Sequence, residues 1–205
     1  MNFIYDRKKT AVVFKNEEYS YENLIKMSKK TSSLMELQKE EKVAIFMENR
    51  VEYMSSILGV WDKKGTCTNL DAGYDTDQLA YVFRDSSPKY ILTSNENIEI
   101  AKSAKELTKS NIIIINVDEI DFTKEVEIKN MSIEALDKDA VAVMLYTSGT
   151  TGNPKGVMLT YDNLMSNIEA VKEIDLVTES DNILASLRFH HVLPLLLTSL
   201  MPLSL

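Results

Sequence analysis

Residues 147–156 bring together residue types that suit phosphate binding. They include three of the chain's six glycines, four hydroxyl side chains and one lysine. These residues are Thr147, Ser148, Gly149, Thr150, Thr151, Gly152, Lys155 and Gly156. Glycine permits positive φ and lets a ligand approach the backbone N–H groups, which can then form an anion-binding concavity. Hydroxyls add donors and can ligate Mg²⁺ as neutral oxygens, and lysine adds a compact positive charge. The stretch therefore predicts a loop for the phosphate tail of a nucleotide triphosphate.

The spacing within this loop excludes two common phosphate-binding patterns. A Walker A loop reads G-x-x-x-x-G-K-[ST] and opens a helix. Counting from Gly149 places Pro154 at the second glycine of that pattern and Gly156 at its hydroxyl position. The stretch also lacks G-x-G-x-x-G, so neither a Rossmann nor a kinase loop fits. A flexible linker rich in serine, threonine and glycine is the alternative. Strand-like runs at 141–146 and 157–159 and a Pro-Lys-Gly turn favour a fixed loop.

Composition limits the possible partners and compartment. The chain has 205 residues, a net charge of −8 and 44% hydrophobic residues, which are ordinary values for a globular protein. Its acidity disfavours binding to nucleic acid or to an anionic membrane. Cys67 is the single cysteine and cannot form an internal disulfide, so we expect a buried thiol and a cytoplasmic protein. The first ten residues have no apolar core typical of a secretory signal.

The elements that must position the loop alternate between strand and helix. We expect a hairpin over 11–19 and strands at 43–47, 66–70, 90–93, 112–117, 141–146, 157–159 and 182–187. Apolar stripes predict helices capped by Ser20, Thr76 and Thr160, with the first stripe running to Leu37, and further helices over 51–64 and 98–107. This alternation, with near-continuous apolar strands, predicts an α/β fold with a mostly parallel sheet covered by helices on both faces.

The loop sequence resembles the signature of the adenylate-forming superfamily, which comprises acyl-CoA synthetases, adenylation domains and luciferases. Residues 146–156, YTSGTTGNPKG, match that signature at every defined position. Residues 19–24 resemble an early T-Y-x-E-L segment of the superfamily, and residues 65–94 resemble its second conserved region. The resemblance thus covers nearly the whole chain and corresponds to the N-terminal part of the family.

The two histidines of the chain are adjacent, which makes them a poor metal chelate. In the family a Leu-Pro-Leu-x-His motif commonly occurs here, and residues 187–191 align with it, so that His191 takes the position of the family histidine. The resemblance implies that His191 lines the acyl and α-phosphate pocket. Arg188 stands where the family usually has proline, so the local turn and the direction of His191 differ from the pattern; a histidine in the core or at the surface is the alternative.

The resemblance also implies an activity and a role for each loop residue. The family joins a carboxylate to the α-phosphorus of ATP, expels pyrophosphate, and then transfers the acyl group to a thiol, usually that of CoA. Residues 147–152 would wrap the β- and γ-phosphates, Thr150 would ligate Mg²⁺, and Lys155 would neutralise phosphate charge. We expect a carboxylic acid as substrate, with a fatty acid favoured. The alternatives are an adenylation domain that loads a carrier protein and a non-catalytic fragment that binds a partner.

The residues divide into three predicted regions. Residues 1–117 form the first βαβ layer, 118–139 a polar connection without functional role, and 140–205 the phosphate loop and the start of the acyl-pocket region. The family's later motifs, Tyr-Gly-x-Thr-Glu and Thr-Gly-Asp, and the lysine of its mobile C-terminal domain do not occur here. We therefore expect a truncated chain that is inactive alone and contains no CoA site. Residues 192–205 carry no charge and are too short for a membrane span. We expect them to form a buried helix whose partners lie downstream; exposed alone, this helix predicts self-association, and a tail anchor is the alternative.

Overall fold

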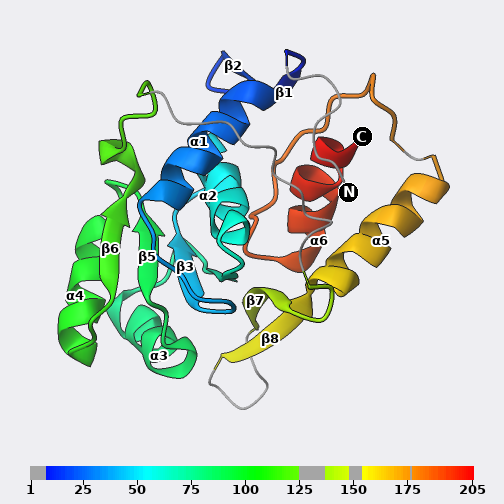
Figure 1. The fold of residues 1–205 in the computed structure, drawn as a ribbon. Coiled ribbons are helices and arrows are strands. Elements are labelled where there is room, and N and C mark those ends of the chain that lie inside the picture. The colour runs from blue at the N-terminus through cyan, green and yellow to red at the C-terminus, as the bar shows by residue number, and fades with distance from the viewer. Residues whose placement is uncertain (1–7, 125–136, 148–153, 176) are drawn as a thin grey trace.

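The computed structural model describes residues 8–124, 137–147, 154–175 and 177–205. Within these ranges the centre is a six-stranded sheet in the order β6-β5-β3-β4-β7-β8 (Figure 1). Its strands are β3 (Lys42–Phe46), β4 (Thr66–Asn69), β5 (Tyr90–Thr93), β6 (Ile113–Asn116), β7 (Val141–Thr147) and β8 (Lys155–Thr160). All neighbours pair in parallel except β7 and β8, which form an antiparallel hairpin. The predicted α/β class with a mostly parallel sheet is confirmed.

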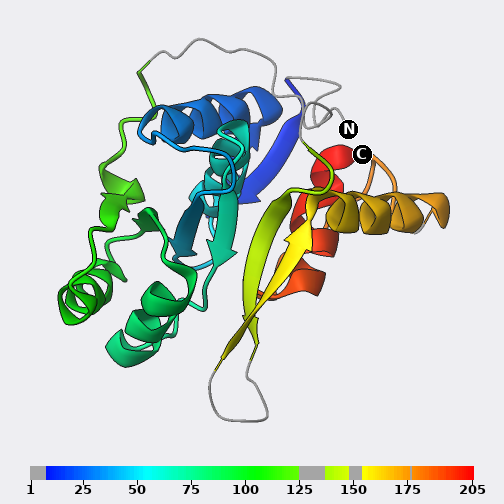
Figure 2. The ribbon, with the colours of Figure 1, turned by 60° about the horizontal axis from the view of Figure 1, so that its bottom comes forward.

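Helices cover both faces of this sheet, as Figure 2 shows for α1 and α2 on one side and α3 and α4 on the other. Their bounds are α1 (Tyr21–Ser33), α2 (Val51–Asp62), α3 (Thr76–Ser86), α4 (Ile98–Thr108), α5 (Tyr161–Glu173) and α6 (Val192–Leu195). The alternation of side chains along each strand separates two cores. Val43 and Ile45 of β3 pack with α1, α2, α5 and the C-terminal residues. Ala44 and Phe46 pack with α3 and α4.

The N-terminal hairpin lies apart from the large sheet. It pairs β1 (Thr10–Phe14) with β2 (Glu17–Ser20), and Lys15 and Asn16 form its turn with φ of 51° and 66°. Ser20 caps α1 as predicted, in a capping box with Asn23. The predicted apolar stripe of this helix is too long, because α1 ends at Ser33 and Leu34 is its exposed C-cap.

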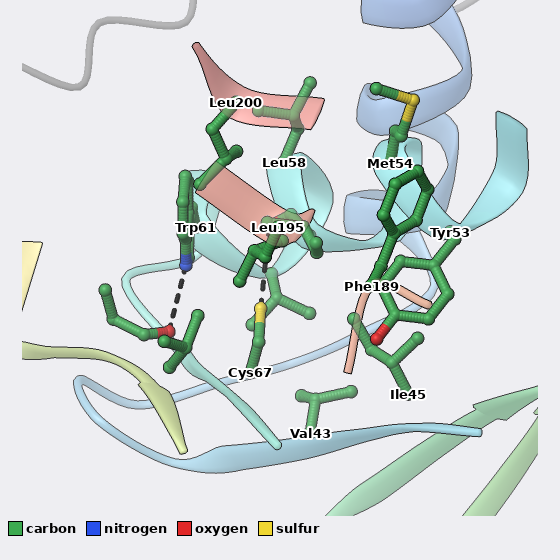
Figure 3. Close-up of a cluster of buried hydrophobic side chains, with 14 of the residues drawn as sticks. Val43, Ile45, Tyr53, Met54, Leu58, Trp61, Cys67, Phe189, Leu195 and Leu200 are labelled. Atoms are coloured by element: carbon green, nitrogen blue, oxygen red, sulfur yellow. Dashed lines mark hydrogen bonds between the residues drawn. The ribbon is translucent and has the colours of Figure 1, made fainter. Parts of the chain in front are cut away.

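Close contact between α1 and α2 depends on a glycine. A Cβ added at Gly59 of α2 would lie 2.8 Å from the Ser28 carbonyl oxygen and 3.2 Å from the Ser32 amide nitrogen of α1. Further along α2, the indole of Trp61 is buried and donates to the Ala142 carbonyl of β7 at 3.0 Å (Figure 3). Cys67 is fully buried beneath α2, as expected. Helix α2 thus joins the helix layer to the centre of the sheet.

Helix caps explain where two further helices begin. Thr160 caps α5 as predicted, in a capping box with Asn163. The prediction that Thr76 caps α3 is wrong by one residue. The carboxylate of Asp75 accepts from the Gln78 amide, and the Gln78 side chain accepts from the Asp75 N–H. An aspartate directly before a threonine offers the better acceptor for the first turn, and its charge suits the helix N-terminus.

The strand expected at 182–187 is absent from the described structure. Residues 181–186 have no regular secondary structure and join neither sheet. A strand needs a neighbour to complete its hydrogen-bond ladder, and among the described residues no strand pairs with this segment. Ile183 and Ala185 pack partly against the core, while 84% of the Leu184 side chain is exposed.

The apolar C-terminal residues do not form one continuous helix. They form α6, a π-helical turn at Leu196–Leu200 and a 3₁₀ turn at Pro202–Ser204. The expectation that their packing partners lie outside this chain is also wrong for most of them. Leu195 and Leu200 pack near Leu58 and Trp61 of α2 (Figure 3). Val192 and Leu193 remain exposed, so self-association stays a prediction with a smaller apolar surface than expected. Within the described ranges, no helix combines the length and apolar character that crossing a membrane requires.

Candidate active site

The predicted phosphate loop lies between the two strands of the β7–β8 hairpin. Thr147 ends β7 and pairs with Lys155, the first residue of β8. Both side chains are exposed, and the Lys155 ammonium has no ion-pair partner within the described part of the chain. The other predicted phosphate contacts, Ser148, Gly149, Thr150, Thr151 and Gly152, and with them the predicted Mg²⁺ ligand, lie outside the described residues. The structure therefore fixes the two ends of the loop and brings its threonine and lysine side by side.

Gly156 has a packing role that differs from the predicted one. It lies within β8 opposite Tyr146, and its φ is not in the positive range that would require glycine. A Cβ at this position would instead lie 2.0 Å from Cε of Met144, whose side chain crosses the space above the glycine. The methionine end is flexible, so this contact selects a small residue without absolutely excluding a larger one. The sequence argument from positive φ is wrong for this glycine.

A second group of polar residues lies at the same edge of the sheet. In the β4–β7 ladder Asn69 pairs with Leu145, so the chain leaves these parallel strands at one edge, at Asp71 and Thr147 respectively. The Asp71 carboxylate accepts from the Gly73 amide at 2.9 Å and from Nη1 of Arg188 at 2.5 Å. Nε2 of His190 lies 3.6 Å from the same carboxylate. Partial burial raises the pKa of Asp71, but these donors outweigh it, and the net pKa lies below its usual value.

The two histidines occupy different environments. His190 is buried, and burial lowers its pKa below the usual 6.5, although the Asp71 charge acts in the opposite direction. His191, the predicted active-site residue, is exposed and is the N-cap of α6. The two ring centroids are 4.1 Å apart. Arg188, which replaces the usual proline of the motif, uses its guanidinium to bind Asp71. His190 is thus held inside the fold, and His191 is the histidine open to a ligand.

Asn49 fixes the segment that carries these histidines. It follows β3, and its side-chain Nδ2 donates to the Leu187 carbonyl at 2.8 Å. Its Oδ1 accepts from the Phe189 amide at 3.0 Å. The Phe189 ring turns the other way and packs edge-on against Tyr53 of α2, with centroids 5.4 Å apart (Figure 3). One amide side chain therefore holds the backbone on both sides of Arg188.

A cavity of about 680 Å³ lies behind this segment. Its walls come from β1, the start of α2, residues 177–185 and the C-terminal turns, and Asn49 and Phe189 are among its lining residues. No residue of β7 or β8 lines it. The cavity is therefore separate from the two strands of the hairpin, and Phe189 is the residue of the 187–191 segment that lines it.

The described start of the polar connection has contacts that the sequence did not predict. Asp118 accepts from Nη2 of Arg50 at 2.6 Å and from the Asn95 amide at 2.7 Å. Arg50 also binds Glu52 at 2.7 Å. These contacts join the ends of β3, β5 and β6, so Asp118 has a structural role, and the absence of a functional role for the connection stays a prediction.

Sequence reasoning missed Asn49 and Asp71. A signal was present, because each follows a buried strand within three residues, and the carboxyl ends of parallel strands are where open α/β sheets place their ligand sites. Their partners could not be read from the sequence, because they lie more than a hundred residues away along the chain.

The family profile described as "AMP-binding enzyme" matches residues 5–205. Among curated proteins, the chain is 32% identical over 157 residues to an oxalate–CoA ligase of Arabidopsis thaliana, covering 73% of this chain and 30% of the relative. It is 28% identical over 179 residues to tyrocidine synthase 1 of Brevibacillus parabrevis, covering 85% of this chain and 16% of the relative.

Solved structures show the same fold. ATP-bound MatB from Rhodopseudomonas palustris aligns with a TM-score of 0.84 at 24% identity, covering 98% of this chain and 41% of that one. The o-succinylbenzoate–CoA synthetase of Bacillus subtilis, in complex with ATP and magnesium, aligns with a TM-score of 0.76 at 24% identity, covering 92% and 49%. This chain thus spans less than half the length of each of these relatives.

Proposed function

The chain belongs to the family of AMP-binding enzymes, which confirms the resemblance found in its loop, and on this premise we propose that it carries the phosphate-binding part of a carboxylic acid–thiol ligase. One observation carries the proposal. The hairpin pairs Thr147 with Lys155 at the ends of a loop of glycines and hydroxyls, at the sheet edge to which Asp71 and the histidine segment also belong. ATP and Mg²⁺ are bound by structural relatives of this chain.

The donor chemistry of the loop fits a phosphate chain with a bound cation. Backbone N–H groups and the hydroxyls of residues 147–151 would hold the β- and γ-phosphate oxygens, and Lys155 would neutralise their charge. The Thr150 hydroxyl would be a ligand of Mg²⁺, whose role is to offset charge on the leaving pyrophosphate. His191, exposed at the start of α6, would contact the α-phosphate or the acyl group.

The proposed reaction has two steps. An oxygen of the substrate carboxylate attacks the α-phosphorus of ATP, the bond to the β-phosphate oxygen breaks, and pyrophosphate leaves. A thiolate then attacks the acyl carbon, and AMP leaves with the carboxylate oxygen. Negative charge grows on the pyrophosphate in the first step, so donors already fixed around it lower that barrier. Lys155 and the loop N–H groups act in this step.

Binding of MgATP tests the part of the proposal that this chain contains. We expect calorimetric titration to show binding that Lys155→Ala weakens about tenfold or more, because a charge-assisted contact is lost. Lys102→Ala is the matched control, since Lys102 is exposed on α4 and pairs with Glu99. Absence of MgATP binding by the unmodified chain, or equal binding by Lys155→Ala, would refute the assignment.

Exchange of labelled pyrophosphate into ATP tests the reaction and its substrate. A panel of fatty acids, small dicarboxylic acids and amino acids is offered, followed by CoA or a phosphopantetheinylated carrier protein. We expect no exchange with these 205 residues alone, since they lack the later family motifs. Robust exchange would refute that expectation and would also identify the acid. The similarity to tyrocidine synthase 1 supports a carrier protein as the second candidate acceptor.

A further inference from the structure

Helix α3 contacts the hairpin on both sides of the phosphate loop, at Tyr146 of β7 and at Pro154 directly before β8. Tyr81 and Asp85 are four residues apart, so they lie on the same side of the helix. The Tyr81 hydroxyl donates to the Pro154 carbonyl at 3.1 Å. The Asp85 carboxylate accepts from the Tyr146 hydroxyl at 2.5 Å. The Asp85 contact is thus just before the loop, at Tyr146, and the Tyr81 contact is at the end of the loop, at Pro154.

The contact before the loop is partly buried and directional. Tyr146 precedes the last residue of β7, and its side chain lies in the core formed with α3 and α4. Burial and the hydrogen bond to the Asp85 carboxylate both raise the pKa of Tyr146 above its usual value. The phenol therefore stays neutral and remains a donor at physiological pH. This contact fixes the end of β7 against α3.

The contact after the loop acts on the residue next to Lys155. Proline has no N–H, so the carbonyl is the one backbone group through which Pro154 can be hydrogen-bonded, and its ring fixes φ. Tyr81 binds that carbonyl while its ring packs against the core under α3. The backbone direction at the start of β8 is thereby set, and the position of Lys155 depends on it.

We propose that Tyr81 and Asp85 are positioning residues that hold the two ends of the phosphate loop at the correct separation for binding the phosphates of ATP. The inference rests on the proposed function, which assigns the loop to phosphate binding. A loop whose ends are already fixed loses less conformational freedom when it binds a ligand. Loss of either contact is expected to weaken nucleotide binding without changing any group that touches the nucleotide.

Tyr81→Phe tests this most cleanly, because it removes the hydroxyl and keeps the ring. We expect the Kd for MgATP to rise about fivefold, the factor that one net hydrogen bond supplies, with a similar rise for Asp85→Ala. Tyr90→Phe is the matched control. Its hydroxyl accepts from the Glu36 amide at 3.1 Å, far from the loop in the chain, and we expect its Kd to be unchanged. Urea unfolding of both phenylalanine variants should show similar midpoints.

Amide hydrogen exchange gives a readout that does not require nucleotide. We expect exchange at residues 155–157 to be about fivefold faster in Tyr81→Phe, with residues 158–160 and the Tyr90→Phe control unchanged. If the unmodified chain binds no MgATP, the proposed function fails, and exchange alone decides the role of Tyr81. Unchanged exchange at 155–157 in Tyr81→Phe, or a Kd equal to that of the control, would overturn the proposal.

Discussion

Asn49→Ala removes the amide that holds the histidine segment. Two hydrogen bonds are lost, at 2.8 Å to Leu187 and at 3.0 Å from Phe189. Each contributes roughly 0.5–1.5 kcal/mol net, and a buried N–H left without a partner costs about 1–3 kcal/mol. Phe189 is 3% exposed, so its amide has little access to solvent. We expect a loss of about 2–3 kcal/mol in the free energy of unfolding, a large part of a total near 5–15 kcal/mol.

The histidines offer an assay specific to this segment. The chain has only two histidines, so the imidazole signal of His190 can be followed by NMR as pH changes. In the intact protein His190 is buried and faces Asp71, Arg188 and His191, and its pKa is below 6.5. When the segment loosens in Asn49→Ala, water reaches the ring and the pKa of His190 should rise toward the usual value. A purely global loss of stability would leave this titration unchanged in the molecules that stay folded.

The same shift sets the pH dependence of stability. A histidine with a lowered pKa in the folded state binds fewer protons there than in the unfolded state, so stability increases with pH between the two values. In the intact protein the free energy of unfolding should therefore fall as pH drops from about 6.5 toward the folded pKa of His190 and then level off. This slope should be smaller in Asn49→Ala.

Asn163→Ala serves as the control for Asn49→Ala. It removes the side chain that completes the capping box of α5, at a cost of about 1 kcal/mol, and should not move the His190 curve. If Asn49→Ala leaves the His190 titration and the pH slope as they are in the intact protein, Asn49 does not position the histidine segment.

Three further predictions concern neighbouring features. Asp71→Asn should lower the pKa of His190 further, because the negative charge of Asp71 opposes the effect of burial on that pKa. A higher pKa of His190 in the same NMR titration would contradict this. Gly59→Ala should destabilise the protein by about 1–3 kcal/mol in urea unfolding, despite alanine's better helix propensity, because its Cβ would meet backbone atoms of α1; Ser103→Ala, on the exposed side of α4, should not. Asp75→Ala should cost about 1 kcal/mol in thermal unfolding through loss of the α3 cap, and Asp75→Asn much less; equal losses would show that the cap is not the cause.

The sequence predicted the sheet well because its strands, apart from β4, are mostly apolar and local signals separate them. Val43–Phe46 and Tyr90–Thr93 are bounded by polar turns, and the caps Ser20 and Thr160 are recognisable from their own residues and those three positions later. The order of the strands depends on contacts distant in the chain, such as the pairing of β4 with β7, which local patterns do not encode.

The failed strand at 182–187 shows where local patterns stop. Its apolar run of Ile183, Leu184 and Ala185 is typical of a strand, but this pattern describes one segment alone. A strand also requires a partner with free backbone groups, and residues 181–186 pair with none among the described residues. The same limit applies to the C-terminal residues. Their lack of charge predicted burial, but it does not show which residues they pack against, and most of them pack within this chain.

The candidate site follows a similar division. The proposal of phosphate chemistry for residues 147–155 could be made from the sequence because it rests on residue types and spacing within one loop. What holds that loop comes from α3, through Tyr81 and Asp85, and what holds the histidine segment comes from β3 and β4, through Asn49 and Asp71. These four residues are ordinary in sequence and become informative only through their partners. A loop motif is therefore enough to propose a ligand, whereas the residues that set the geometry of the loop must be found from the fold.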